Sequence, residues 1–144
     1  MTNLHKVALV VITVSSGLVG LWAQAFPRSF YDDFPGMGRV WVAVDGPYNE
    51  HLVRDVGGLN LGLTFIAIFA LATGSVLVAR AAGGAALLFG VPHLLYHLTH
   101  MDPFDTADAV GIAVSLSIAA LAAALLLVAP AAAATTEGRS PAPR

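Results

Sequence analysis

The chain has 144 residues, of which 57% are hydrophobic and only 11% are charged, and its formal net charge is −2. Soluble domains carry about a quarter charged residues, so this composition, with a mean hydropathy of +0.76, excludes an ordinary soluble domain. The weak net charge and the lack of a Lys/Arg-rich run exclude a nucleic-acid-binding protein. The absence of cysteine excludes disulfides and thiolate metal sites.

Four apolar stretches are long enough to cross about 30 Å of hydrocarbon as helices, at about 1.5 Å per residue. They predict transmembrane helices over about residues 7–25, 52–79, 81–98 and 107–129. Because a helix satisfies its backbone hydrogen bonds within one segment, we expect residues 1–129 to form an all-α integral membrane four-helix bundle. Residues 130–144 are rich in Ala, Thr, Ser and Pro and predict a disordered cytoplasmic tail.

The first apolar stretch allows a second interpretation. Lys6, the apolar run and the small-x-small end at residues 23–25 resemble a secretory signal peptide. The run is longer than the apolar region of a usual signal, so we favour an uncleaved helix. Cleavage would leave the direction of the other three helices unchanged.

The connections between the predicted helices differ in length. The second and third helices meet near Arg80, which predicts a hairpin that reverses there. Residues 26–50 form the long connection, and their Pro and Gly content argues against a long regular element. We expect an extracytoplasmic loop that caps the bundle and places Tyr31, Trp41 and Tyr48 at headgroup level.

The basic residues determine the expected orientation, because cytoplasmic loops carry more Lys and Arg. With both termini inside, the cytoplasmic side holds Lys6, Arg80, Arg139 and Arg144, and the outside holds Arg28, Arg39 and Arg54. The acidic residues, a weaker determinant, lie mostly outside. We therefore expect a multi-pass protein of the inner (plasma) membrane with cytoplasmic N- and C-termini.

Small residues indicate where the helices touch, because they let two backbones approach. Gly58 and Gly62 form a GxxxG pattern on the second helix, and Gly83, Gly84 and Gly90 mark the third. We expect these residues to serve packing.

Four of the five histidines lie near the outer ends of the second and third helices, whereas His5 lies in the N-terminal flank without an evident partner. At about 100° per residue, His93, His97 and His100 fall on one stripe roughly 60° wide. His51 and Asp55 are four residues apart on the second helix, on the face that carries the GxxxG pattern. A helical hairpin brings these two sets to a similar depth.

This constellation suits a transition metal. Two imidazoles and a carboxylate suit iron, zinc or manganese, and three or four imidazoles suit zinc or copper. Pro92, directly before His93, frees a backbone carbonyl and predicts a bend that opens a polar cavity. We therefore predict a divalent metal site near the outer membrane face, formed by His51, Asp55, His93, His97 and His100.

If such a metal acts on a lipid or apolar substrate, Tyr96 and Glu50 are the candidates for proton transfer, and Asp32 or Glu50 could add a ligand from the loop. One alternative is a haem b electron-transfer protein, with axial imidazoles from His51 and from His93 or His97. Another is a non-enzymatic membrane subunit or scaffold with interfacial histidines, either as a homo-oligomer or with a membrane partner. Asp105 or Thr106 is expected to cap the fourth helix.

The four-helix layout with a long first connection, over residues 7–129, resembles the small bacterial membrane proteins grouped as DoxX-like and related uncharacterised families. This resemblance is one of architecture and implies no functional residue. The HxxxD pair at His51 and the HxxxH pair at His93 are also similar to pairs in membrane metallohydrolases of the ceramidase and adiponectin-receptor type. Those enzymes bind zinc through three histidines in a seven-helix fold, so the likeness implies no substrate for this chain.

Overall fold

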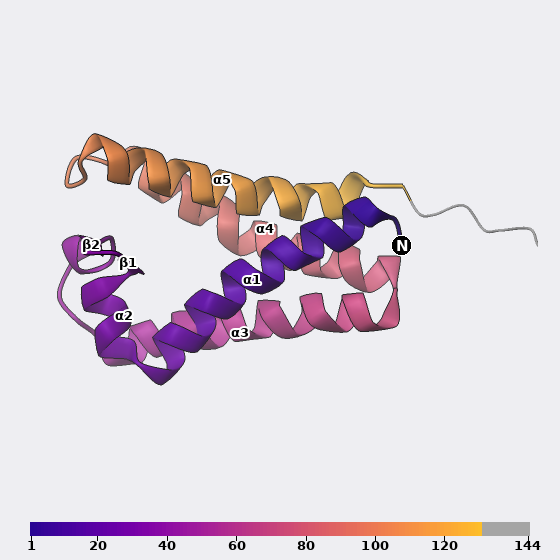
Figure 1. Ribbon diagram of the computed structural model, residues 1–144, viewed down its shortest axis with the longest axis horizontal. Coiled ribbons are helices and arrows are strands. Elements are labelled where there is room, and N and C mark those ends of the chain that lie inside the picture. Colours follow the sequence, from indigo (N-terminus) through magenta and orange to yellow (C-terminus); the bar gives the residue numbers. More distant parts are fainter. Residues whose placement is uncertain (131–144) are drawn as a thin grey trace, which may run out of the picture.

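The computed structural model describes residues 1–130 and is mainly helical (Figure 1). Its four long helices are α1 (Asn3–Ala25), α3 (Glu50–Thr73), α4 (Val76–Thr99) and α5 (Thr106–Val128), and each is long and apolar enough to cross a membrane. The predicted all-α class with four long apolar helices is therefore confirmed. The predicted disordered tail lies outside the described residues, except for Pro130.

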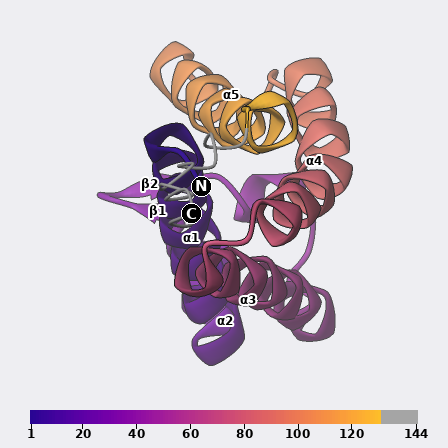
Figure 2. The ribbon, with the colours of Figure 1, turned by 90° about the vertical axis from the view of Figure 1, so that its right-hand side faces the viewer.

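The four long helices surround a common axis in the order α1, α3, α4, α5 (Figure 2). The N-terminus, the α3–α4 turn and the end of α5 lie together at one end of the bundle, which we call the closed end (Figure 1). The opposite end carries the connection between α1 and α3, and we call it the cap end. Towards the cap end, α1 diverges from α5 and stays close to α3 (Figure 1).

The turn between α3 and α4 lies at Gly74 and Ser75, so the predicted reversal at Arg80 is wrong. Gly74 ends α3 with a φ of +64°, a left-handed conformation that glycine adopts without steric cost. The Ser75 side chain then accepts a hydrogen bond from the Val78 amide, at 3.3 Å, and caps α4. Apolar residues continue on both sides of this turn, so hydropathy alone did not locate it.

Residues 26–49 form a folded cap, so the predicted long loop is wrong. The cap contains α2 (Pro27–Asp33), an antiparallel hairpin of β1 (Pro35–Gly36) and β2 (Arg39–Val40), and the 3₁₀ helix η1 (Ala43–Asp45). Pro27 occupies the first turn of α2, where a missing amide hydrogen breaks no helical bond. Pro27 and Pro35 therefore each begin a short element rather than prevent one.

An aromatic cluster attaches the cap to α1. Phe30 is 5% exposed, and the edge of Trp22 on α1 contacts both Phe30 and Phe34, with ring centroids 6.1 and 6.0 Å apart. Phe34 in turn contacts Trp41, at 6.0 Å. Burial of these large side chains stabilises the cap against the bundle.

A second set of contacts joins the cap to α5. Arg39 forms an ion pair with Asp108, and the Trp41 indole Nε1 donates a hydrogen bond to the same carboxylate at 2.7 Å. Hydrogen bonding to Asp108, and then the charge of that carboxylate, raises the pKa of Arg39 above its ordinary value. Asp105 caps α5 by accepting from the Asp108 amide at 2.8 Å, as expected.

The closed end is packed by small residues. Its core includes Ala8, Ala67, Ala70, Ala79, Ala82, Ala122 and Ala123. At Gly83 an added Cβ would lie 2.7 Å from the Ala123 carbonyl oxygen, so α4 and α5 touch through their backbones. His5 is fully buried here, and its Nδ1 lies 2.7 Å from the Thr2 hydroxyl, so it is neither a free flank residue nor without a partner.

The GxxxG residues do not form the α1–α3 contact. No atom lies within 4 Å of a Cβ built on Gly62, and only the Gln24 side chain approaches that of Gly58. The close approach is at Gly57, where a Cβ would lie 2.7 Å from the Gln24 backbone nitrogen, and at Gly20, where it would lie 2.9 Å from the Leu61 nitrogen. The predicted packing face of α3 is therefore wrong by one residue, or about 100°.

Candidate functional site

A cavity of about 360 Å³ extends from the cap into the middle of the bundle. Its walls come from all four long helices and from the cap, and most of the lining side chains are apolar. The cap contributes Phe30, Phe34, Trp41, Val42 and Asp45, and α4 contributes Ala86, Phe89, Gly90, His93 and His97. The lining includes residues of α1 and α5, whose ribbons diverge towards the cap end in Figure 1, and of the cap itself.

His93 and His97 form the main polar feature of this cavity. Their rings are 4.8 Å apart in an edge-on arrangement, and Phe89 stacks on His93 at 5.3 Å. His97 Nδ1 is buried and has no hydrogen-bond partner among residues 1–130. His93 lies about six residues, or roughly 9 Å, from the end of α4. The prediction that these two imidazoles share one helix face is consistent with this arrangement.

Asp45 is the third ionisable residue that lines the cavity, and sequence reasoning missed it. Its carboxylate accepts a hydrogen bond from the Tyr96 hydroxyl at 3.2 Å, and it lines the same cavity as both imidazoles. The position of η1 over α4 depends on how the cap folds, and no local pattern in the sequence signals that contact. Tyr96, predicted as a proton-transfer residue, therefore contacts the cap carboxylate.

The two carboxylates proposed as loop ligands lie elsewhere. Asp32 forms an ion pair with Arg28 at 2.6 Å, and Glu50 forms one with Arg54 at 2.9 Å. Neither side chain lines the cavity. Glu50 therefore does not share the cavity with the two histidines, and its position does not support its predicted role in proton transfer or as a ligand.

His51 and Asp55 lie on the wrong face of α3 to join the cavity histidines. They form a pair with each other, with His51 Nε2 3.2 Å from Asp55 Oδ2, and their side chains are 87% and 61% exposed. The opposite face of α3 lines the cavity with Val56 and with Asn60, which is only 5% exposed. The GxxxG pattern led to the prediction that the face with His51 and Asp55 packs against a neighbouring helix, but this face is exposed.

His100 also leaves the predicted stripe. It is the C-cap of α4, with a non-helical φ of −133°, and its ring stacks on Tyr96 with centroids 4.2 Å apart. The 100° rule holds only inside a helix, and α4 ends at Thr99. The five predicted ligands are therefore not brought together, and the described residues contain no group of three or more His, Asp or Glu side chains that could hold a metal ion. Metal and haem binding both stay predictions.

Weakly polar groups lie deeper in the cavity. Ser15, Asn60 and Ser115 line it about 14 to 15 Å from the cap ends of their helices. Each donates to a carbonyl of its own helix, at 2.8, 2.9 and 3.1 Å respectively, and retains oxygen lone pairs that can accept a further hydrogen bond. The cavity therefore has polar groups at two depths within apolar walls.

These features define a helical membrane protein with a folded cap and a cavity between its helices. No protein family model, no curated protein and no solved structure matches the chain. The DoxX-like resemblance therefore stays an expectation about architecture.

Proposed function

We propose that this protein binds a small apolar or amphiphilic molecule in the cavity between its helices. The observation that carries the proposal is the size and lining of the cavity, about 360 Å³ with largely apolar walls and a few convergent polar groups. Small-molecule sites in proteins typically measure about 300 to 1,000 Å³ and have this composition. The polar end of the ligand lies near His93 and His97.

Packing elsewhere in the same chain supports a binding role for the cavity. Protein interiors are close-packed, with few voids larger than a water molecule. The closed end is packed closely through alanine and glycine contacts, such as Gly83 against Ala123. The cavity is therefore a local feature of the cap end and not a general looseness of the bundle.

The ligand reaches the cavity from the bilayer in this proposal. Ser15 on α1 and Ser115 on α5 each line the cavity, and both residues are exposed. We place the opening between these two helices, at the two serines. An opening between two membrane-spanning helices faces lipid, which is where an apolar molecule accumulates.

Binding can be tested with the neutral apolar fluorophore N-phenyl-1-naphthylamine on protein in lipid nanodiscs. The chain has two tryptophans, so Trp22→Phe leaves Trp41, a cavity residue, as the sole energy donor. We expect saturable energy transfer from Trp41 to the fluorophore. Ala86→Phe places a ring in the cavity and is expected to abolish this transfer.

The matched control is Ala81→Phe, which adds the same ring to an exposed position of α4 that does not line the cavity. It is expected to bind like the parent. Equal binding by the two phenylalanine variants, or transfer that never saturates above that of empty nanodiscs, would overturn the proposal.

A further inference from the structure

We propose that the cavity selects a lipophilic cation, such as a hydrophobic ammonium or phosphonium ion, over neutral and anionic molecules of the same shape. This inference rests on the proposed function and names its ligand class. It depends on the charge of the cavity lining, on its aromatic residues and on the polar atoms that the cavity offers.

The cavity lining contains a single carboxylate and no lysine or arginine side chain. Asp45 lines the cavity together with His93 and His97, and no Lys or Arg does so. Asp45 has no ion pair within residues 1–130, and its one side-chain hydrogen bond comes from the neutral Tyr96 hydroxyl. With neutral imidazoles, the cavity therefore carries a negative charge that a cationic ligand would balance.

The arginines at the cap end are already engaged by other carboxylates. They form the pairs Arg28–Asp32, Arg39–Asp108 and Arg54–Glu50. None of these arginines lines the cavity. An anionic ligand would therefore find no basic partner in the lining, whereas a cation would find the carboxylate of Asp45.

Aromatic rings line the cavity from the cap inward. Phe30, Phe34 and Trp41 from the cap and Phe89 from α4 all line it. Aromatic faces attract cations through the ring quadrupole, and combinations of aromatic rings commonly bind hydrophobic ammonium groups. The Trp41 N–H already donates to Asp108, so this ring offers no free donor to an anion.

The histidines fit the same ligand class. A neutral imidazole places no charge against a cation and accepts a hydrogen bond through one ring nitrogen. An ammonium ligand that carries an N–H group can therefore donate to an imidazole of the lining.

The decisive experiment displaces N-phenyl-1-naphthylamine from the unmodified chain in nanodiscs with two ions of the same shape and opposite charge. We expect tetraphenylphosphonium to displace the fluorophore at a concentration about tenfold below that needed for tetraphenylborate, which is the order of magnitude for one opposite charge at the exposed Asp45. Empty nanodiscs correct for the partition of each ion into lipid. Equal displacement, or better displacement by the borate, would overturn the inference.

A variant pair tests the assigned carboxylate. Asp45→Asn removes the charge and keeps the shape. It is expected to raise the phosphonium concentration for half-displacement about tenfold, after correction for any change in the dissociation constant of the fluorophore itself. Asp102→Asn removes the same charge from an exposed position at the cap end, outside the cavity lining, and is expected to change neither value.

The outcomes separate this inference from the proposed function. If the unmodified chain does not bind the fluorophore, the proposed function fails. If it binds the fluorophore and Asp45→Asn leaves phosphonium displacement unchanged, only the cation inference fails. If Asp45→Asn loses the fluorophore as well, the comparison of phosphonium with borate on the unmodified chain decides, because it needs no variant.

Discussion

The four helices pack differently at the closed end and at the cap end of the bundle. At the closed end, alanines and glycines let α4 and α5 touch through their backbones, as at Gly83 and Ala123. At the cap end, α1 and α5 diverge, and aromatic side chains of a separate folded segment, such as Phe34 and Trp41, occupy part of the space. The same four helices thus form a tight contact at one end and a cavity that extends from the other end into the middle of the bundle.

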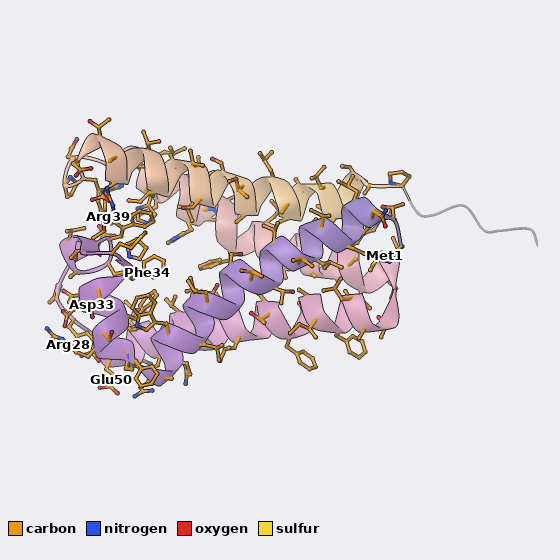
Figure 3. The ribbon with its side chains drawn as sticks, in the orientation of Figure 1. Met1, Arg28, Asp33, Phe34, Arg39 and Glu50 are labelled. Atoms are coloured by element: carbon orange, nitrogen blue, oxygen red, sulfur yellow. The ribbon has the colours of Figure 1, made fainter. Side chains whose placement is uncertain are left out.

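The charges follow the same division. Every acidic residue within residues 1–130 lies at the cap end, namely Asp32, Asp33, Asp45, Glu50, Asp55, Asp102, Asp105 and Asp108. Figure 3 shows Arg28, Asp33, Arg39 and Glu50 at this end and Met1 at the other. Small residues therefore hold the helices together at the closed end, whereas the acidic residues are concentrated at the end where the helices separate.

The largest effect is expected from breaking the closed end. Gly83→Ala would bring a Cβ within 2.7 Å of the Ala123 carbonyl oxygen and 2.8 Å of Leu126 Cβ, so α4 and α5 must separate. We expect a loss of about 1 to 3 kcal/mol in the free energy of unfolding, the usual range for overpacking. Unfolding in mixed micelles, titrated with dodecyl sulfate, measures it.

Gly84→Ala is the matched control, because no atom lies within 4 Å of its Cβ position. Alanine favours a helix over glycine by up to about 1 kcal/mol, so this variant is expected to be as stable as the parent or more so. A Gly83→Ala protein as stable as Gly84→Ala would show that the closed end is not tightly packed.

A smaller and local effect is expected from breaking the attachment of the cap. Asp108→Asn removes the charge that pairs with Arg39 while retaining an oxygen that can accept from Trp41. We expect hydrogen exchange at the amides of residues 35–45 to become severalfold faster, with exchange in the closed-end core unchanged. Asp102→Asn serves as the control for loss of charge. Faster exchange throughout the bundle would contradict the view that the cap opens separately.

The sequence predicted the parts of the fold that depend on local chemistry. Long apolar runs gave four helices, and Asp105 was one of two residues expected to cap the fourth. The turn at Gly74 was missed because its flanking residues are as apolar as the helices. The cap was missed because elements as short as β1, with two residues, are stabilised by tertiary contacts rather than by their own sequence.

The sequence predicted only the part of the candidate site that lies on a single helix. His93 and His97 share a face because they are four residues apart, and both line the cavity. To predict Asp45 as a cavity residue, one must know where the cap lies over α4. To predict that His51 lies outside the cavity, one must know how α3 is rotated about its own axis. Neither quantity is encoded in spacing along one helix, and Asn60, opposite His51 on α3, was the polar residue that marked the buried face.

The smallest effect is expected from the pair that the sequence placed at the centre of the site. His51→Ala and Asp55→Ala, alone or together, are expected to change the free energy of unfolding by less than about 0.5 kcal/mol, because exposed ion pairs contribute little. Fluorophore and phosphonium binding are expected to stay as in the parent, since neither side chain lines the cavity. His97→Ala, which removes an imidazole from the cavity wall, is expected to weaken fluorophore binding in the same assay. Should the His51 and Asp55 changes weaken binding while His97→Ala does not, the functional face of α3 would be the exposed one, and the site would lie outside the cavity.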